Sequence, residues 1–219
     1  MKNIHLYFIA IGFSILSCTN SDHVKGELSK EKEHKILIDL RSDLSQNLED
    51  INSNIESLII SKKANEIVIN AKKNNLQYHD SLDFHFANLY PYLVFSPNET
   101  TFNYLKTIGM NSISNDSLRA SISDLYGVRY GVYKSYESIY FVEHYTNYIK
   151  PMFMVEFESF KFYRSFKPRN YNKFITNQEN KRIITYTRDA IESFIFLQAG
   201  LKEDAEQIVA AIDRELKNQ

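Results

Sequence analysis

Apolar residues recur at helical spacing over two long stretches of the chain, and this periodicity limits the fold more than any other feature. Between Ser29 and Asn74 the apolar positions form one stripe, made by Leu37, Leu40, Leu44, Leu48, Ile51, Ile55 and Leu58. From Gln178 to Lys217 apolar residues are again spaced by threes and fours. The two patterns predict two long amphipathic helices.

Two polar residues interrupt the first stripe. Asn47 and Asn54 fall at positions where a strict heptad seam would carry apolar side chains. The stripe therefore drifts around the helix, as it does in a globular bundle. This drift makes a dedicated coiled coil the weaker interpretation of the segment.

A shorter helix is predicted for residues 97–108 from the residues at its two ends. Ser96 can cap the first turn, Pro97 suits the first helical position, and Glu99 can bond back to the cap. Gly109 is expected to end the segment, because glycine is common just past the last turn of a helix.

Another long helix is predicted to start after Ser114 or Asn115 and to run toward Ile149. Pro151 lacks the amide that a continuing helix needs, so we expect a kink or a stop there. Residues 77–93 are expected to hold one short helix. No segment alternates apolar and polar residues between hairpin turns, so a sheet is not expected.

These elements predict an all-α fold, namely an elongated antiparallel helical bundle of about four main helices with one or two short helices. The chain of 219 residues has four prolines, six glycines and no glycine- or serine-rich stretch, which argues against a long flexible linker. We therefore expect residues 29–219 to form a single helical-bundle domain.

The N-terminus has the layout of a secretory signal. Lys2 supplies positive charge, residues 6–16 form an almost unbroken apolar run, and Ser17 and Cys18 follow immediately. A run of about 11 apolar residues is too short for a transmembrane helix, which takes about 20. Since Ile-Leu-Ser-Cys resembles a lipobox, we expect residues 1–17 to be removed and Cys18 to carry lipid. The alternative is a chance cysteine beside an ordinary cleavage site.

Composition and charge narrow the environment of the mature chain. Residues 18–28 are expected to form a polar tether that holds the domain off the lipid. Cys18 is the only cysteine, so no disulfide is expected. With 26 basic and 27 acidic residues, the charge is balanced and no nucleic-acid partner is indicated. Thr19 stands where aspartate commonly retains lipoproteins at the inner membrane, so by resemblance we expect the outer membrane, on its periplasmic face.

The middle of the chain resembles a known family. The resemblance rests on Phe95-Ser96-Pro97, Thr101-Phe102, Leu105-Lys106, Gly109, Ile113, Asn115, Leu118-Arg119 and Leu125-Tyr126. It is a family of uncharacterised Gram-negative envelope proteins, a domain of unknown function, in which a long amphipathic helix precedes this block. The resemblance covers residues 33–217 and implies a helical, N-terminally membrane-anchored protein without catalytic residues to transfer. Members usually open with a transmembrane helix, whereas this chain opens with a lipobox.

Motifs that would indicate an enzyme are missing. A di-metal carboxylate bundle needs two Glu-x-x-His motifs, and the chain has one, from Glu31 to His34. Neither a Gly-x-Ser-x-Gly motif nor a glycine-rich phosphate loop is present. His79, Asp80, Asp83 and His85 could ligate a metal such as zinc, or form a solvated turn; the turn is preferred. We therefore expect no enzyme, no cofactor and no metal.

Tyrosines line one face of the helix predicted after residue 115. At 100° per residue a narrow arc contains Tyr126, Tyr130, Tyr133, Glu137, Tyr140, His144 and Tyr148. As a site, this face would bind a small cationic or amphipathic ligand between helices. As structure, it is a half-buried stripe whose hydroxyls bond to neighbouring helices, and this reading is preferred.

A basic and aromatic stretch occupies residues 160–174 and contains no acidic residue. Its cations are Lys161, Arg164, Lys167, Arg169 and Lys173, which alternate with Phe162, Tyr163, Phe166 and Tyr171. Such a mixture suits anionic lipid headgroups, lipopolysaccharide phosphates or an acidic partner. The preferred interpretation is a connection between helices whose aromatic side chains cover the end of the bundle, with solvated charges.

The sequence thus favours a non-catalytic, membrane-anchored envelope lipoprotein whose bundle binds a membrane surface or an envelope protein of unknown identity. The alternative is a periplasmic small-ligand binding or sensing module that uses the tyrosine face. A closed pocket lined by Tyr130, Tyr133, Glu137 and His144 would favour the ligand module. A solid core with an exposed apolar or basic patch would favour the interaction module.

Overall fold

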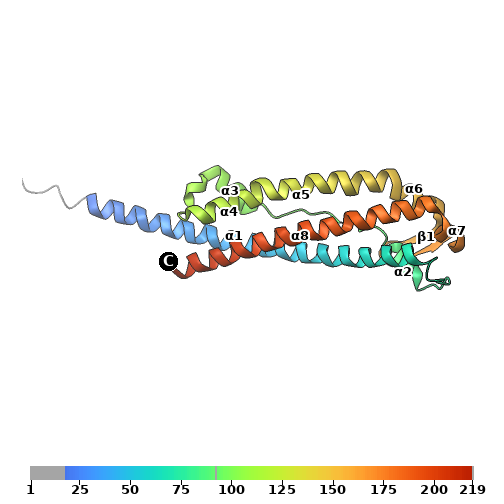
Figure 1. Ribbon diagram of the computed structural model, residues 1–219. Helices are drawn as coiled ribbons and strands as arrows, with labels where there is room; N and C mark the ends of the chain where they lie inside the picture. The colour runs from blue at the N-terminus through green and yellow to red at the C-terminus, as the bar shows by residue number, and fades with distance from the viewer. Residues whose placement is uncertain (1–17, 92, 219) are drawn as a thin grey trace, which may run out of the picture.

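The computed structural model describes residues 18–91 and 93–218, with side chains described from residue 29 onward. Its elements are, in order, α1 Cys18–Asn70, α2 Leu82–Ala87, α3 Thr100–Ile108, η1 Met110–Ser112, α4 Asp116–Asp124, η2 Leu125–Arg129, α5 Tyr130–Glu137, η3 Ser138–Glu143, η4 Tyr145–Ile149, α6 Lys150–Glu156, β1 Phe157–Lys161, β2 Ser165–Pro168, α7 Tyr171–Thr176 and α8 Gln178–Asn218. They form an elongated helical bundle, so the predicted all-α fold is confirmed (Figure 1). The expected signal peptide, residues 1–17, lies outside the described residues.

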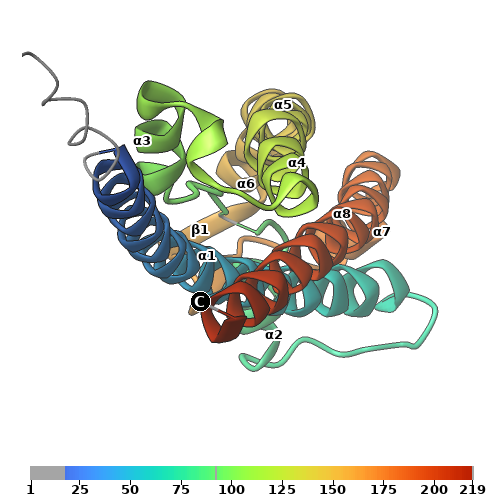
Figure 2. The ribbon, with the colours of Figure 1, turned by 90° about the vertical axis from the view of Figure 1, so that its left-hand side faces the viewer.

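Three long helical rods build the bundle. Helices α1 and α8 run antiparallel and share the most extensive packing in the described chain. The third rod consists of α4, η2, α5, η3, η4 and α6 joined end to end, and is called the composite helix (Figure 1). It lies on one side of the α1–α8 pair (Figure 2). Because α1 begins at Cys18, the segment expected to be a polar tether is helical.

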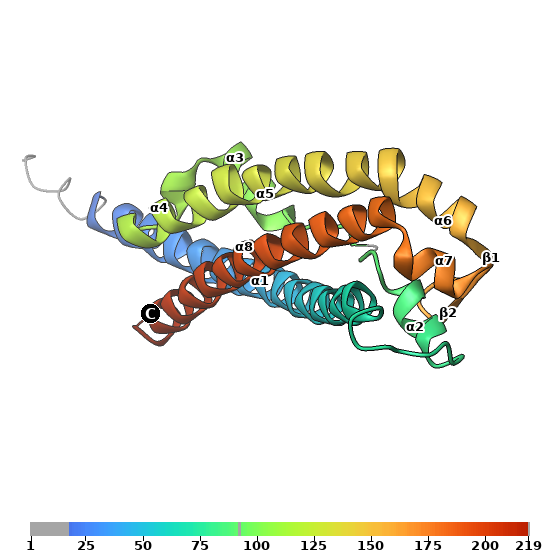
Figure 3. The ribbon, with the colours of Figure 1, turned by 45° about the vertical axis from the view of Figure 1, so that its right-hand side comes forward.

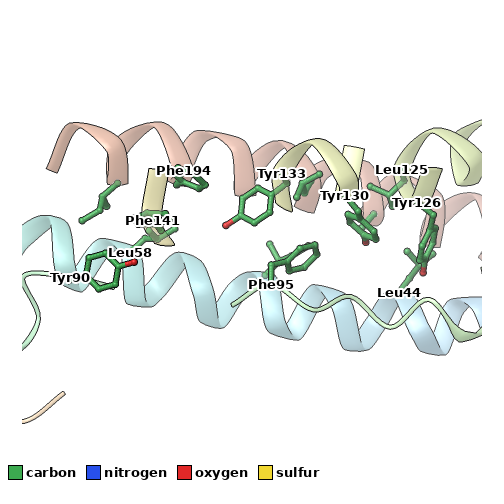
Figure 4. Packing of buried hydrophobic residues seen from close by; sticks show 14 of the residues in the cluster. Leu44, Leu58, Tyr90, Phe95, Leu125, Tyr126, Tyr130, Tyr133, Phe141 and Phe194 are labelled. Atoms are coloured by element: carbon green, nitrogen blue, oxygen red, sulfur yellow. The ribbon is translucent and has the colours of Figure 1, made fainter. Parts of the chain in front are cut away.

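An extended segment, residues 89–91 and 93–99, threads between α1 and the composite helix and is called the threaded segment (Figures 1 and 4). Its backbone polar groups need partners, because buried unpaired amides are costly. Asn65 Nδ2 donates to the Leu89 carbonyl at 2.8 Å, and Asn47 Oδ1 accepts from the Asn98 amide at 2.6 Å. Asn47 is therefore polar because it pairs with the backbone of the threaded segment. Drift of the apolar stripe, the explanation expected from the sequence, does not account for this contact.

The prediction that α3 starts at Pro97 was wrong, since the helix starts at Thr100. Pro97 belongs to the threaded segment, and the side chain of Glu99, the residue just before the helix, makes no capping hydrogen bond. Two other side chains accept its first amides: Asn98 Oδ1 accepts from the Thr100 amide at 3.1 Å, and Asp43 Oδ2 of α1 accepts from the Thr101 amide at 2.8 Å. A carboxylate is favourable at a helix N-terminus. Gly109, with φ 99°, ends the helix as predicted.

The composite helix begins as predicted, because the Asn115 side chain accepts from the Leu118 amide at 3.0 Å. It continues through Pro151, which occupies the first turn of α6, where the missing amide costs little. The π-helical η4 ends just before α6, and the rod changes direction there (Figure 3). The predicted kink is therefore present, and the rod ends at Glu156.

The expectation that no sheet forms was wrong at one place, where β1 and β2 pair as an antiparallel hairpin. Its three-residue loop joins Lys161 to Ser165 through Phe162, Tyr163 and Arg164. Tyr163 has φ 62°, a left-handed conformation that usually falls to glycine or asparagine. Without these turn residues, and with strands of five and four residues, the hairpin left no clear signal in the sequence.

None of the helices within residues 18–91 and 93–218 has an apolar stretch long enough to cross a bilayer.

Candidate functional site

The first half of the tyrosine face is part of the core. Tyr126, Tyr130 and Tyr133 are buried, and their rings pack edge-on against one another or against Phe95 of the threaded segment (Figure 4). Burial raises the pKa of all three phenols. Because the rings fill the space between the rods, this half of the face is packed against protein.

Each of these hydroxyls has a polar neighbour on another rod. Asn47 Nδ2 lies 3.4 Å from the Tyr126 hydroxyl and 3.5 Å from the Tyr130 hydroxyl. Gln198 Nε2 of α8 donates to the Tyr133 hydroxyl at 2.6 Å. Buried hydroxyls normally find such partners. This half of the face is therefore a packed stripe, and the tyrosine hydroxyls bond to neighbouring helices, as the preferred interpretation of the sequence expected.

Glu137 and His144 are buried on the same face. Glu137 accepts the Phe95 amide at 3.1 Å, so it pairs a backbone group of the threaded segment. Burial raises the pKa of the Glu137 carboxyl, and the Phe95 hydrogen bond opposes part of that rise. His144 Nε2 lies 2.9 Å from the Thr187 hydroxyl of α8, and burial lowers its pKa. Both residues connect different parts of the bundle.

The far half of the tyrosine face opens into a groove between η3, η4 and α8. An open hollow of about 520 Å³ is lined by Tyr140, His144, Tyr148 and, from α8, Tyr186. A second hollow of about 650 Å³ shares Tyr140 and Tyr186 and continues toward Phe196. The His144 ring centroid lies 4.7 Å from that of Tyr186 and 5.4 Å from that of Tyr148. Of the predicted ligand face, Tyr140 and His144 therefore border open space.

A second candidate site is the β1–β2 hairpin at the far end of the bundle (Figure 3). Its base is held by aromatic packing, because Phe157 and Phe166 are fully buried. The Phe166 ring centroid lies 5.2 Å from that of Phe153 in α6, and the Phe157 centroid lies 5.2 Å from that of Phe174 in α7. These contacts fix the hairpin rigidly to the bundle end.

The loop of this hairpin presents aromatic and basic side chains to solvent. Phe162 is 51% exposed and Tyr163 is 56% exposed. All five predicted contact cations are exposed, namely Lys161, Arg164, Lys167, Arg169 and Lys173. Lys167 pairs with Glu158 at 3.3 Å, whereas the other four have no carboxylate within ion-pair distance among the described residues. The structure thus brings the predicted basic residues together on one end of the molecule.

The histidines and aspartates before α2 do not converge on one point. His79 Nδ1 lies 2.9 Å from Asp80 Oδ1, while Asp83 accepts the Tyr78 hydroxyl at 3.0 Å. Burial, helped by the Asp83 bond, raises the pKa of Tyr78 to about 12. Across residues 29–91 and 93–218, no group of three or more histidine, cysteine or acidic side chains is placed to hold a metal ion.

Sequence reasoning missed several residues that complete these sites. Thr187 and Gln198 are buried polar residues of α8, and the apolar spacing that predicted this helix gave no signal for them. Tyr186 carried no signal, since its part in the groove depends on how α8 lies beside the composite helix. These residues act through contacts between rods, which spacing along one rod does not reveal.

No family model matches the chain, and comparisons with curated proteins and with solved structures find no similar protein. The resemblance to an envelope family, based on the block from Phe95 to Tyr126, therefore stays a prediction.

Proposed function

We propose that this chain is a non-catalytic envelope lipoprotein, anchored through lipid on Cys18, whose helical bundle serves as an interaction module. The observation that carries the proposal is the exposed basic and aromatic hairpin at one end of a rod with a solid core. The composition of the signal region, from Lys2 to Cys18, supports the anchor.

Arrangement along the rod also supports this function. Helix α1 starts at Cys18 and runs along the bundle, so its 53 residues span about 80 Å at 1.5 Å per residue. The hairpin lies at the opposite end of the molecule from this start (Figures 1 and 3). A lipid-anchored rod of this form would hold its hairpin away from the anchoring membrane, toward a periplasmic partner.

The anchor is tested by intact mass and membrane fractionation of the native protein beside a Cys18→Ala variant. We expect a lipid-sized mass addition on a chain that starts at Cys18, and loss of membrane association in the variant. A soluble native protein without added mass would contradict the lipoprotein proposal. A Ser21→Ala variant is the matched control, since it changes a neighbouring small residue and leaves the cysteine in place.

A second candidate function, a small-ligand module, is favoured by the groove beside His144. Tyr140, Tyr148 and Tyr186 line the groove with aromatic rings, and the exposed Glu143 adds a carboxylate. Arg182 also lines it, and its charge is paired with Glu179 at 2.6 Å. Titration with tetraethylammonium, followed by NMR of the tyrosine rings, tests it. Saturable shifts that vanish in Tyr186→Ala but persist in Tyr104→Ala would support the module. Shifts of equal size in both variants would remove it.

A further inference from the structure

The hairpin end of the bundle has the form of a membrane-contact tip. The loop projects at the end of the molecule, and its Phe162 and Tyr163 rings are more than half exposed (Figure 3). Lys161 and Arg164 flank these rings, and Arg169 and Lys173 lie toward the base of the hairpin; none of the four has a carboxylate partner among the described residues. Aromatic rings settle at the interface of a bilayer while neighbouring cations bind anionic headgroups. The same tip therefore offers both kinds of contact.

Backbone strain in the loop is located at Tyr163, which carries one of the two exposed rings. Tyr163 has φ 62°, and a bulky side chain there costs energy that glycine would not. The Arg164 amide donates to the Lys161 carbonyl at 2.9 Å, so the loop is closed tightly around this residue. The strained residue is thus also one whose ring is exposed, and strained residues cluster at binding sites.

A lipid surface fits this tip better than an acidic protein does. A stable protein interface buries about 800 Å² on each partner, commonly around anchors seated in pockets. The loop is a projecting tip of three residues, all of them exposed, of which two carry aromatic rings and one is an arginine (Figure 3). A fluid anionic surface adapts to a projecting tip, and each cation near it strengthens binding by about fivefold.

We propose that the hairpin tip binds an anionic lipid surface, so that the protein bridges the membrane holding Cys18 and a second lipid surface at the other end of the rod. The bridging part rests on the proposed lipoprotein function, because it needs the anchor. The contact part rests on Phe162, Tyr163 and the cations around them. Since α1 separates the two ends by about 80 Å, the tip reaches away from the anchoring bilayer.

The test uses native protein reconstituted through its lipid into labelled phosphatidylcholine vesicles, which carry no net charge. These are mixed with unlabelled vesicles that contain phosphatidylglycerol, and vesicle capture is measured at low and at physiological salt. We expect capture of phosphatidylglycerol vesicles that weakens with salt, and no capture of pure phosphatidylcholine vesicles. Equal capture of both kinds, or no capture at low salt, would overturn the proposal; the latter would leave an acidic protein as the partner.

Two variants separate the tip from general effects. Lys161→Glu with Arg164→Glu should weaken capture by about 100-fold or more, from about fivefold for each unit of charge. Its matched control reverses two exposed lysines at the other end of the bundle, Lys32→Glu with Lys35→Glu, and should capture normally. Equal loss in both double variants would show an effect of net charge alone and overturn the assignment to the hairpin.

Tyr163→Gly keeps the loop and removes the ring. Because glycine accepts the left-handed conformation, the variant should unfold at the same or a higher denaturant concentration while capture falls by about tenfold. Unchanged capture would contradict the role of the ring. If the protein fails to remain on the first vesicles, the anchor has failed instead. Co-sedimentation of the free protein with phosphatidylglycerol vesicles then tests the hairpin separately.

Discussion

Replacing Asn47 by leucine tests whether a polar residue at this seam position supports the fold through the threaded segment. A heptad pattern favours leucine here, because the position lies in the apolar stripe of α1. In the structure Asn47 is buried, accepts the Asn98 amide at 2.6 Å and donates to the Asn98 carbonyl at 3.2 Å. Asn47→Leu therefore leaves backbone groups of Asn98 without their partner.

The expected loss can be estimated from these contacts. A buried group deprived of its hydrogen bond costs about 1–3 kcal/mol, so the two part-buried backbone groups of Asn98 together cost about 3 kcal/mol, of which the greater apolar burial of leucine offsets about 1 kcal/mol. We expect Asn47→Leu to lower the free energy of unfolding by about 2 kcal/mol. With a urea dependence of about 2 kcal/mol/M, the midpoint of unfolding followed by circular dichroism falls by about 1 M.

Asn54, one heptad later on the same helix, provides the matched control. It is half-buried, and its amide nitrogen has no hydrogen-bond partner among the described residues. Asn54→Leu should therefore leave stability unchanged or raise it. If Asn47→Leu proved as stable as the unmodified protein, the pairing of Asn47 with the threaded segment would not contribute to stability, and the reasoning would fail.

Three further predictions follow from the buried polar groups. Since burial raises the folded-state pKa of Glu137, stability should fall as pH rises above about 4.5, and Glu137→Gln should flatten that part of the urea-midpoint profile. The lowered pKa of His144 has the opposite consequence: its contribution to stability is present above pH 6.5 and is lost on acidification. His144→Gln should reduce this loss, and an unchanged fall of the urea midpoint at acidic pH would contradict the prediction. Tyr130→Phe should lower the free energy of unfolding by less than about 1 kcal/mol, because the hydroxyl contact that it removes is 3.5 Å long. Tyr130→Ala, which removes the buried ring, should lower it by about 4 kcal/mol in thermal unfolding. Similar losses in both variants would assign the stabilisation to the hydroxyl.

Elements controlled by local chemistry were predicted well. Helix α8 spans Gln178–Asn218, within one residue of the range predicted from its apolar spacing. Asn115 caps the composite helix, and Gly109 ends α3, as their residue types indicated. In each case the signal lies within one turn of the chain, where helical periodicity and capping bonds act.

Features that depend on another part of the chain were not predicted. The start of helix α3 is stabilised in part by Asp43, which is far away in sequence and accepts the Thr101 amide. The β1–β2 hairpin forms without turn residues because Phe157 and Phe166 are buried under the bundle end. The position of this hairpin places the predicted basic stretch, residues 160–174, at the end of the bundle.

The sequence by itself determined the helical fold, the extent of α8 and the collection of basic residues in 160–174, because these follow from spacing and composition along the chain. Only the tertiary structure decided which polar side chains meet. It placed Tyr130 and Tyr133 in the core, opened the groove beside Tyr140, and set the hairpin at the opposite end from Cys18. Such pairings depend on how separate rods pack, and the free energy of burying each polar group is known only once its neighbours are in place.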